Sequence, residues 1–206
     1  MLNGNLMIDV NTEQIRRTQT GDAQVLSELY ERYYRGIFRY LYYRVGDRQI
    51  AEDLTSEVFI RMLRFIAGFH PPAAMFQSWL FQITRNLAID HYRKTSGREN
   101  LALEERMTSA NLDLDRTVEQ NLTSESLRLA LDRLTEDQRD VIVMRFVAEM
   151  PLAQVARALH KSEDAVKGLQ RRALLALRRI LSEWEISYGR PRSTIRTKFE
   201  RHGDRE

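Results

Sequence analysis

Apolar residues recur at steps of three and four along most of the chain, which is the spacing of one face of an α-helix. In the N-terminal half this spacing predicts a short helix over residues 13–19, with Thr12 as its N-cap, followed by three long helices. The apolar stripes of the long helices are Val25, Leu26, Leu29, Tyr30, Tyr33, Ile37, Tyr40 and Leu41; then Ile50, Leu54, Val58, Met62 and Phe65; and then Trp79, Leu80, Ile83, Leu87 and Ile89. Stripes of this kind must pack against one another, so they predict a helical bundle.

Capping residues set the boundaries of these helices. Asp22 is the expected N-cap of the first long helix, and Gly46 followed by Asp47 ends that helix and starts the next. Residues 68–74 must form a loop, because two consecutive prolines cannot continue a helix. The last helix of this block is therefore expected over about residues 76–94.

A second helical block with shorter elements follows in the C-terminal half. Leucines at helical spacing lead up to Thr135, which forms a capping box with Gln138 and opens the next helix. Pro151 suits the first turn of a short helix over residues 152–159, and Ser162 is the expected N-cap of a final long helix. The buried side of that last helix is predicted to carry Val166, Leu169, Ala173, Leu174, Leu177 and Ile180.

Two segments lack an apolar stripe. Residues 96–122 are polar, acidic and only weakly periodic, which predicts a flexible linker. Residues 187–206 are basic and are predicted to be a disordered tail. The predicted fold is therefore all-α, with two small helical domains, residues 1–95 and 123–186, joined by the flexible linker.

The composition narrows the chemistry. The 206 residues include no cysteine, which excludes disulfides, thiolate zinc sites and cysteine nucleophiles. The four histidines do not stand at a metal-binding spacing, and no catalytic constellation or glycine-rich phosphate loop is evident. We therefore expect no enzyme activity, no cofactor and no metal. With no signal peptide and no apolar run near the ~18 residues of a membrane span, we expect a cytoplasmic protein.

Two short helices joined by three or four residues, the second basic on its outer face, are typical of a helix-turn-helix. A helix that enters the major groove must offer donors to phosphates and base edges. The candidates on the helix after Ser162 are Lys167, Gly168, Gln170, Arg171 and Arg172. Gln170 could instead cap the turn. An ordinary antiparallel helix pair with a charged outer face would give the same pattern, and the net charge of +3 does not decide between them.

Two parts of the chain resemble regions 2 and 4 of the extracytoplasmic-function (ECF) sigma factors of bacteria. For region 2, over residues 26–94, the resemblance is carried by LYERYY at 29–34, AEDLTSEVF at 51–59 and WLFQITRNLAIDHYRK at 79–94. For region 4, over residues 127–181, it is carried by LDRLTEDQRDVIVMRFV and PLAQVARALHKSEDAVKGLQRRALLALRRIL. The resemblance implies a transcription initiation subunit that binds the clamp and flap of core RNA polymerase and promoter DNA. It also implies an anti-sigma factor as a further partner.

The resemblance assigns roles to particular residues. It implies that Asp53, Ser56, Glu57 and Arg61 meet the polymerase clamp, although the family usually has Gln where this chain has Ser56. A solvated helix face with a Glu57–Arg61 pair is the alternative. The resemblance implies that the minus-ten element is contacted by Arg85, Asn86, Arg93 and Lys94 of the last helix in this block. It also implies that a flipped base stacks on Phe69, His70 and Phe76. The alternative for the two phenylalanines is that they close a helix corner.

Region 4 departs from the commoner family pattern. After Val-Lys the family usually has Ser-Arg-Leu, whereas this chain has Gly168-Leu169-Gln170. The resemblance therefore implies recognition of a minus-thirty-five element without implying the base preference. The rival function is a conventional helix-turn-helix regulator that binds an operator as a dimer without polymerase, and it leaves residues 22–94 unexplained.

Overall fold

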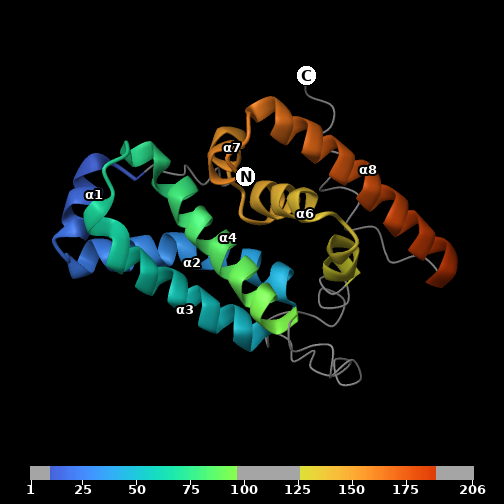
Figure 1. Ribbon diagram of the computed structural model, residues 1–206, viewed down its shortest axis with the longest axis horizontal. Helices are drawn as coiled ribbons and strands as arrows, with labels where there is room; N and C mark the ends of the chain where they lie inside the picture. Colours follow the sequence, from blue (N-terminus) through green and yellow to red (C-terminus); the bar gives the residue numbers. More distant parts are fainter. Residues whose placement is uncertain (1–9, 97–125, 189–206) are drawn as a thin grey trace, which may run out of the picture.

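The computed structural model describes residues 10–96 and 126–188, and within these ranges the regular secondary structure is helical throughout, without strands (Figure 1). The predicted acidic linker and basic tail lie almost entirely outside the described residues. The described part forms two helical domains, which confirms the predicted fold class. Figure 1 shows α2, α3 and α4 side by side in the first domain, with α6, α7 and α8 grouped in the second.

The N-terminal domain is a bundle of three long helices with a short one across its end. Its elements are α1 (Thr12–Gln19), α2 (Ala23–Val45), α3 (Arg48–Phe65) and α4 (Phe76–Ser96), with the 3₁₀ turns η1 (Ile66–Gly68) and η2 (Ala73–Met75) between α3 and α4. Asp22 and Asp47 cap α2 and α3 as predicted. The N-cap of α1 is Asn11 rather than Thr12, because Asn11 and Gln14 form a reciprocal capping box.

The C-terminal domain contains the shorter helices. Residues 126–132 are helical, and α6 (Glu136–Ile142) follows the predicted Thr135–Gln138 capping box. α6 continues as a π-helix, η4 (Val143–Val147), in which the Ala148 amide donates to the Val143 carbonyl at 2.9 Å. α7 (Leu152–Ala158) and α8 (Glu163–Tyr188) complete the domain.

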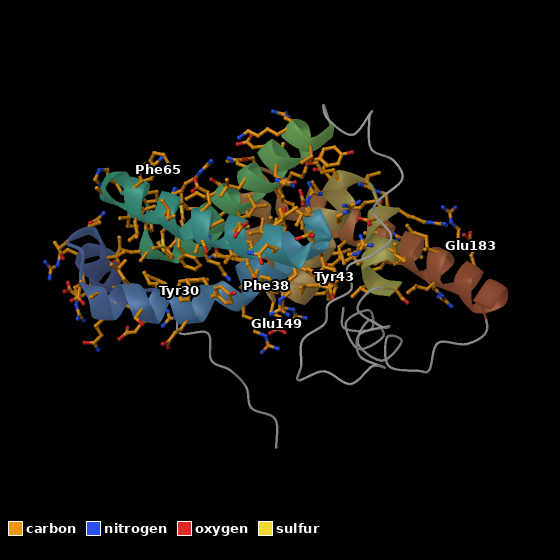
Figure 2. The ribbon with its side chains drawn as sticks, turned by 90° about the horizontal axis from the view of Figure 1, so that it is seen from below. Tyr30, Phe38, Tyr43, Phe65, Glu149 and Glu183 are labelled. Carbon is orange, nitrogen blue, oxygen red and sulfur yellow. The ribbon has the colours of Figure 1, made fainter. Side chains whose placement is uncertain are left out.

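The core of α3 differs from the predicted stripe. Its buried positions are Ala51, Thr55, Val58, Phe59 and Met62, whereas Phe65 is 53% exposed (Figure 2). Two of these buried positions, Ala51 and Thr55, are small, and α3 packs against both α2 and α4. The side of α3 that carries Ile60 and Leu63 is left at the surface.

Gly46 ends α2 in the left-handed conformation, with φ of 77°. A side chain is strained there, and a methyl group would also lie 3.0 Å from the Arg128 guanidinium. We therefore expect Gly46→Ala to lower the free energy of unfolding by about 1 kcal/mol, measured by urea denaturation. Gly68→Ala is the matched control, because its φ is ordinary and the space around it is open. Equal stabilities of the two variants would contradict this account.

Candidate nucleic-acid and protein-binding surfaces

α7 and α8 form a helix-turn-helix with a tightly hydrogen-bonded turn. The Lys161 amide donates to the Ala156 carbonyl at 2.9 Å, and the His160 amide donates to the Arg157 carbonyl at 3.2 Å. This is the Schellman arrangement, and it places His160 in the left-handed region with φ of 53°. The Ser162 hydroxyl then accepts from the Ala165 amide at 3.2 Å and caps α8, as predicted.

The first turns of α8 present a cationic face to solvent. Lys167, Arg171 and Arg172 are exposed, and Lys167 has a long contact of 3.5 Å with the exposed Asp164. Gly168 lies beside this face, and the nearest side chain to it is that of Arg172. The structure therefore brings together four of the five residues suggested for the major groove.

Gln170, the fifth candidate, lies on the inner side of α8, one turn from the buried Val166 and Ala173. The Nε of Arg145 in η4 donates to Gln170 Oε1 at 3.3 Å. A terminal nitrogen of the same guanidinium donates to the Met150 carbonyl at 2.5 Å. Burial lowers the pKa of the Arg145 guanidinium. Gln170 thus connects α8 to η4 through a side-chain contact, which differs from the alternative of capping the turn. The helical periodicity of the sequence gave no sign of this role for Arg145.

The outer face of α3 carries the residues assigned to a protein partner. Asp53 and Ser56 are exposed, and the half-buried Glu57 accepts from Arg61 Nε at 2.8 Å. The pair expected for a solvated face is therefore formed. Ile60 and Leu63, each 49% exposed, extend the same side of α3, so acidic and apolar side chains adjoin there. The helical periodicity did not single out these two residues as surface residues.

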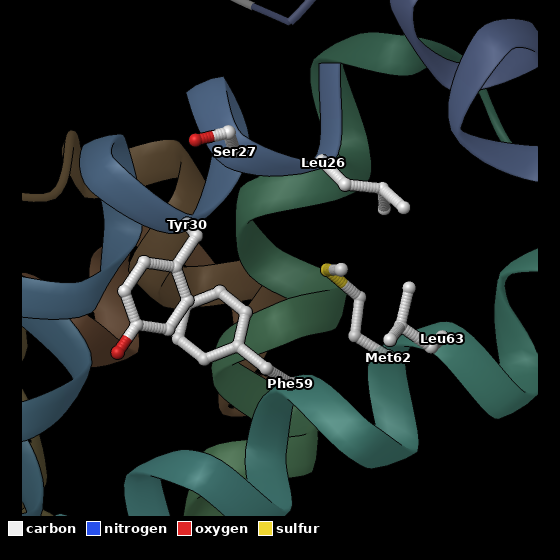
Figure 3. A pocket seen from close by; sticks show the side chains of 6 residues that line it. All are labelled: Leu26, Ser27, Tyr30, Phe59, Met62 and Leu63. Atoms are coloured by element: carbon white, nitrogen blue, oxygen red, sulfur yellow. The ribbon is translucent and has the colours of Figure 1, made fainter. Parts of the chain in front are cut away.

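An apolar groove lies between α2 and α3 next to this face (Figure 3). It has a volume of about 250 Å³ and is lined by Leu26, Ser27, Tyr30, Phe59, Met62 and Leu63. Tyr30 packs its ring at 4.7 Å from that of Phe59 and remains 44% exposed. Exposed aromatic and aliphatic side chains in a groove favour contact with another protein.

The corner between α3 and α4 does not offer Phe69 and Phe76 for stacking on a base. Phe69 is 4% exposed and Phe76 is fully buried, and their rings meet edge to face at 5.8 Å. Phe69 also packs against Trp79 at 4.9 Å. The two phenylalanines therefore close the helix corner in this structure, which is the alternative role, and the expectation that they stack on a base is corrected. His70 alone of the three is exposed.

The four residues of α4 that were suggested for the minus-ten element are not equally accessible. Asn86, Arg93 and Lys94 are exposed. Arg85, in contrast, is turned towards the C-terminal domain, where its Nε donates to Asp140 Oδ2 at 2.7 Å. Burial lowers the pKa of Arg85, but the hydrogen bond and charge of Asp140, together with the nearby Tyr40 and Glu136, raise it above its usual value.

Asp140 is fully buried between the two domains. Its Oδ1 accepts from the Tyr40 hydroxyl at 2.6 Å and lies 3.5 Å from Arg44. Burial, together with the adjacent carboxylate, raises the pKa of Tyr40 well above its usual value. We call Tyr40, Arg44, Arg85 and Asp140 the Asp140 cluster.

Within the described ranges, no three His, Asp or Glu side chains gather as metal ligands would. Of the helices that the structure describes, none is both long enough and apolar enough to cross a membrane.

Comparisons with known proteins match each of the two domains to a family. The family model of Sigma-70 region 2 matches residues 29–98, and that of Sigma-70, region 4 matches residues 130–179. The ECF RNA polymerase sigma factor BldN of Streptomyces coelicolor is 38% identical over 175 residues, covering 83% of this chain and 66% of BldN. The ECF RNA polymerase sigma factor SigX of Bacillus subtilis is 33% identical over 157 residues, covering 73% of this chain and 80% of SigX.

Two solved structures share the fold. CnrH in complex with the cytosolic domain of CnrY superposes with a TM-score of 0.67 at 20% identity, covering 85% of this chain and 99% of CnrH. The sigma factor RpoE in complex with the anti-sigma factor NepR from Bartonella quintana superposes with a TM-score of 0.62 at 17% identity. The match covers 76% of this chain and 96% of the matched chain. With both family models matched in order, the chain belongs to the ECF sigma factors.

Proposed function

We propose that this chain binds core RNA polymerase and directs it to promoters. Residues 1–95 would engage the polymerase clamp and the minus-ten element, and residues 123–186 the minus-thirty-five element and the flap. The observation that supports this proposal best is the combination, on one chain, of cationic faces on α4 and α8 with an acidic and apolar face on α3. A regulator that binds an operator as a dimer would instead have to use this third surface to contact its second copy.

The polymerase contact is proposed for the outer face of α3. Asp53, Ser56 and Glu57 would accept charge-assisted hydrogen bonds from basic groups of the clamp. The exposed Ile60 and Leu63 add apolar surface beside these polar groups, and burial of that surface would strengthen the contact. Arg61 pairs with Glu57 and holds that carboxylate in place.

The minus-ten contact is proposed for Asn86, Arg93 and Lys94 of α4. Arg85 would join them once it is released from Asp140, and His70 would contribute from the edge of the loop before α4. Asn is suited to a base edge, while Arg and Lys hold phosphates. Because the rings of Phe69 and Phe76 are buried, they are left out of this surface.

The minus-thirty-five contact is proposed for Lys167, Gly168, Arg171 and Arg172, with Gln170 supporting them from the inner side of α8. We expect Arg171→Ala to lower transcription from a promoter that depends on its minus-thirty-five element by about tenfold, since one base or phosphate contact is worth about 1–3 kcal/mol. Run-off transcription with intact and scrambled elements measures this dependence.

The matched control is Arg179→Ala, which removes the same charge two turns further along α8 from a side chain that is 77% exposed. Arg179 lies past the reach of the groove, so its loss should change transcription less than about twofold. An equal loss in both variants would indicate a general charge effect and would contradict the assigned face.

An anti-sigma factor is a further proposed partner. Both solved structures with the same fold are named as complexes with another protein, and NepR is named as an anti-sigma factor. The groove between α2 and α3 adjoins the face proposed for polymerase, so a protein seated there would compete with the clamp. Neither proposed role gives the chain catalytic chemistry of its own.

In vitro transcription with purified core polymerase on a genomic library tests the proposed function. Specific start sites should arise only when the chain is added. Tight binding of the chain alone to a duplex operator, with no new transcripts, would favour the regulator instead.

A further inference from the structure

A second groove lies beyond the Asp140 cluster, where α4 packs against α7. One side of this groove is formed by α4 and the loop before it, and the other side by α7 and the turn that follows it. Its volume is about 370 Å³, which is within the usual range of small-molecule sites. The chemistry of its two sides therefore indicates what kind of molecule could bind there.

The α4 side of the second groove is apolar and aromatic. Trp79 and Met75 are half-buried, and they line the groove together with the exposed Pro71. The Trp79 ring packs at 4.9 Å from that of Phe69 and at 5.6 Å from that of Phe76, and both phenylalanines are buried. Because these contacts fix the Trp79 ring in advance, a flat ligand ring could pack on it with little loss of side-chain entropy.

The α7 side of the second groove is basic. Arg157 and His160 are exposed, and the third basic residue, Lys161, pairs with Asp137 at 2.9 Å. Within the part of the chain that the structure describes, no residue forms an ion pair or hydrogen bond with the side chain of Arg157 or His160. None of the described residues that line the groove is acidic. A molecule that carries an aromatic ring at one end and an anion at the other would match both sides.

We propose that the second groove binds a small phosphorylated aromatic molecule of the size of a mononucleotide. Its ring would pack on Trp79, and its phosphate would accept hydrogen bonds from Arg157 and His160. A phosphate suits these side chains because its oxygens can accept paired hydrogen bonds from a guanidinium and a further one from an imidazole. This site goes beyond the proposed function, and its test requires neither polymerase nor promoter DNA.

Titration of the full chain with adenosine monophosphate, followed by the emission of Trp79, tests the proposal. The chain has two tryptophans, so the substitution Trp184→Phe makes the emission report on Trp79 alone. We expect adenosine monophosphate to quench this emission and to raise the melting temperature, because a ligand that binds only the folded state stabilises it. Adenosine and inorganic phosphate each supply one of the two groups, so each should bind at least about tenfold more weakly.

Substitutions on the basic side of the groove are made in the same background. Arg157→Ala should lower the affinity for adenosine monophosphate by about tenfold, since a hydrogen bond between charged groups is worth about this factor. His160→Asn should also lower the affinity, and asparagine tolerates the left-handed backbone of this position, where φ is 53°. The matched control is Arg64→Ala, which removes the same charge from an exposed position of α3 and should leave the affinity unchanged.

The absence of any response to millimolar adenosine monophosphate would overturn the inference. Equal affinities for adenosine monophosphate and inorganic phosphate would also overturn it, because the ring would then contribute nothing. So would equal affinities of the Arg157→Ala and Arg64→Ala variants for adenosine monophosphate. A short deoxyadenylate oligonucleotide distinguishes a free ligand from a nucleic acid. If the oligonucleotide binds in the groove while adenosine monophosphate does not, the groove is a nucleic-acid contact and the inference is wrong.

Discussion

Phe76→Ala should lower the free energy of unfolding by about 3–5 kcal/mol, the usual effect of removing a buried aromatic ring. Phe76 is fully buried, and its ring packs against Tyr33 at 5.7 Å, Phe69 at 5.8 Å and Trp79 at 5.6 Å. Its loss therefore opens a cavity where α2, α4 and the loop before α4 meet. Urea denaturation of the full chain, followed by circular dichroism, measures the change.

The neighbouring His70→Ala provides the control for this substitution. His70 is in the loop before α4 but is exposed, so its removal should alter stability by less than about 0.5 kcal/mol. If Phe76 were instead a surface ring reserved for a base, its loss would leave stability almost unchanged. That outcome would restore the stacking role that burial argues against.

Asp53→Lys should weaken binding to core RNA polymerase by about 100-fold. The substitution places a positive charge on a face proposed to meet basic groups, and like charges brought together at an interface oppose binding by several kcal/mol. Asp53 is exposed and accepts a long hydrogen bond of 3.3 Å from Gln49 Nε2 one turn earlier, so the fold should be unaffected. Biolayer interferometry with immobilised core polymerase gives the dissociation constant.

Glu31→Lys makes the same change of charge at an exposed position of α2 outside the proposed surface. Its affinity for polymerase should remain within about threefold of that of the unmodified protein. If the two variants bind equally well, the outer face of α3 is not the contact. If both bind equally weakly, net charge rather than a specific face controls the interaction.

Local signals in the sequence predicted the helices well. Asp22, Asp47 and Ser162 cap helices because a short polar side chain can satisfy the free amides of the turn that follows it, whatever the tertiary context. The glycine at the end of α2 is equally local. In α8 the apolar stripe also marked the buried side, which left the cations Lys167, Arg171 and Arg172 on the exposed side.

Features that depend on distant residues could not be predicted in this way. Tyr40 and Asp140 are separated by 100 positions, and nothing near either residue shows that they meet. The periodicity also assigned Phe65 to the core in place of Phe59, because it does not report which side of α3 the other helices cover. The partnership of Arg145 with Gln170 likewise joins two elements that are 25 positions apart.

The number of residues in the continuous helix formed by α6 and η4 matters as much as which residues they are. Asp140 precedes η4 and points to the N-terminal domain, whereas Arg145 lies within it and points to α8. Deleting a single residue between them would rotate everything that follows by about 100° around the helix axis. Even a deletion that removed no charged or capping residue would therefore break one of the two attachments, so insertions and deletions should be far less tolerated here than substitutions.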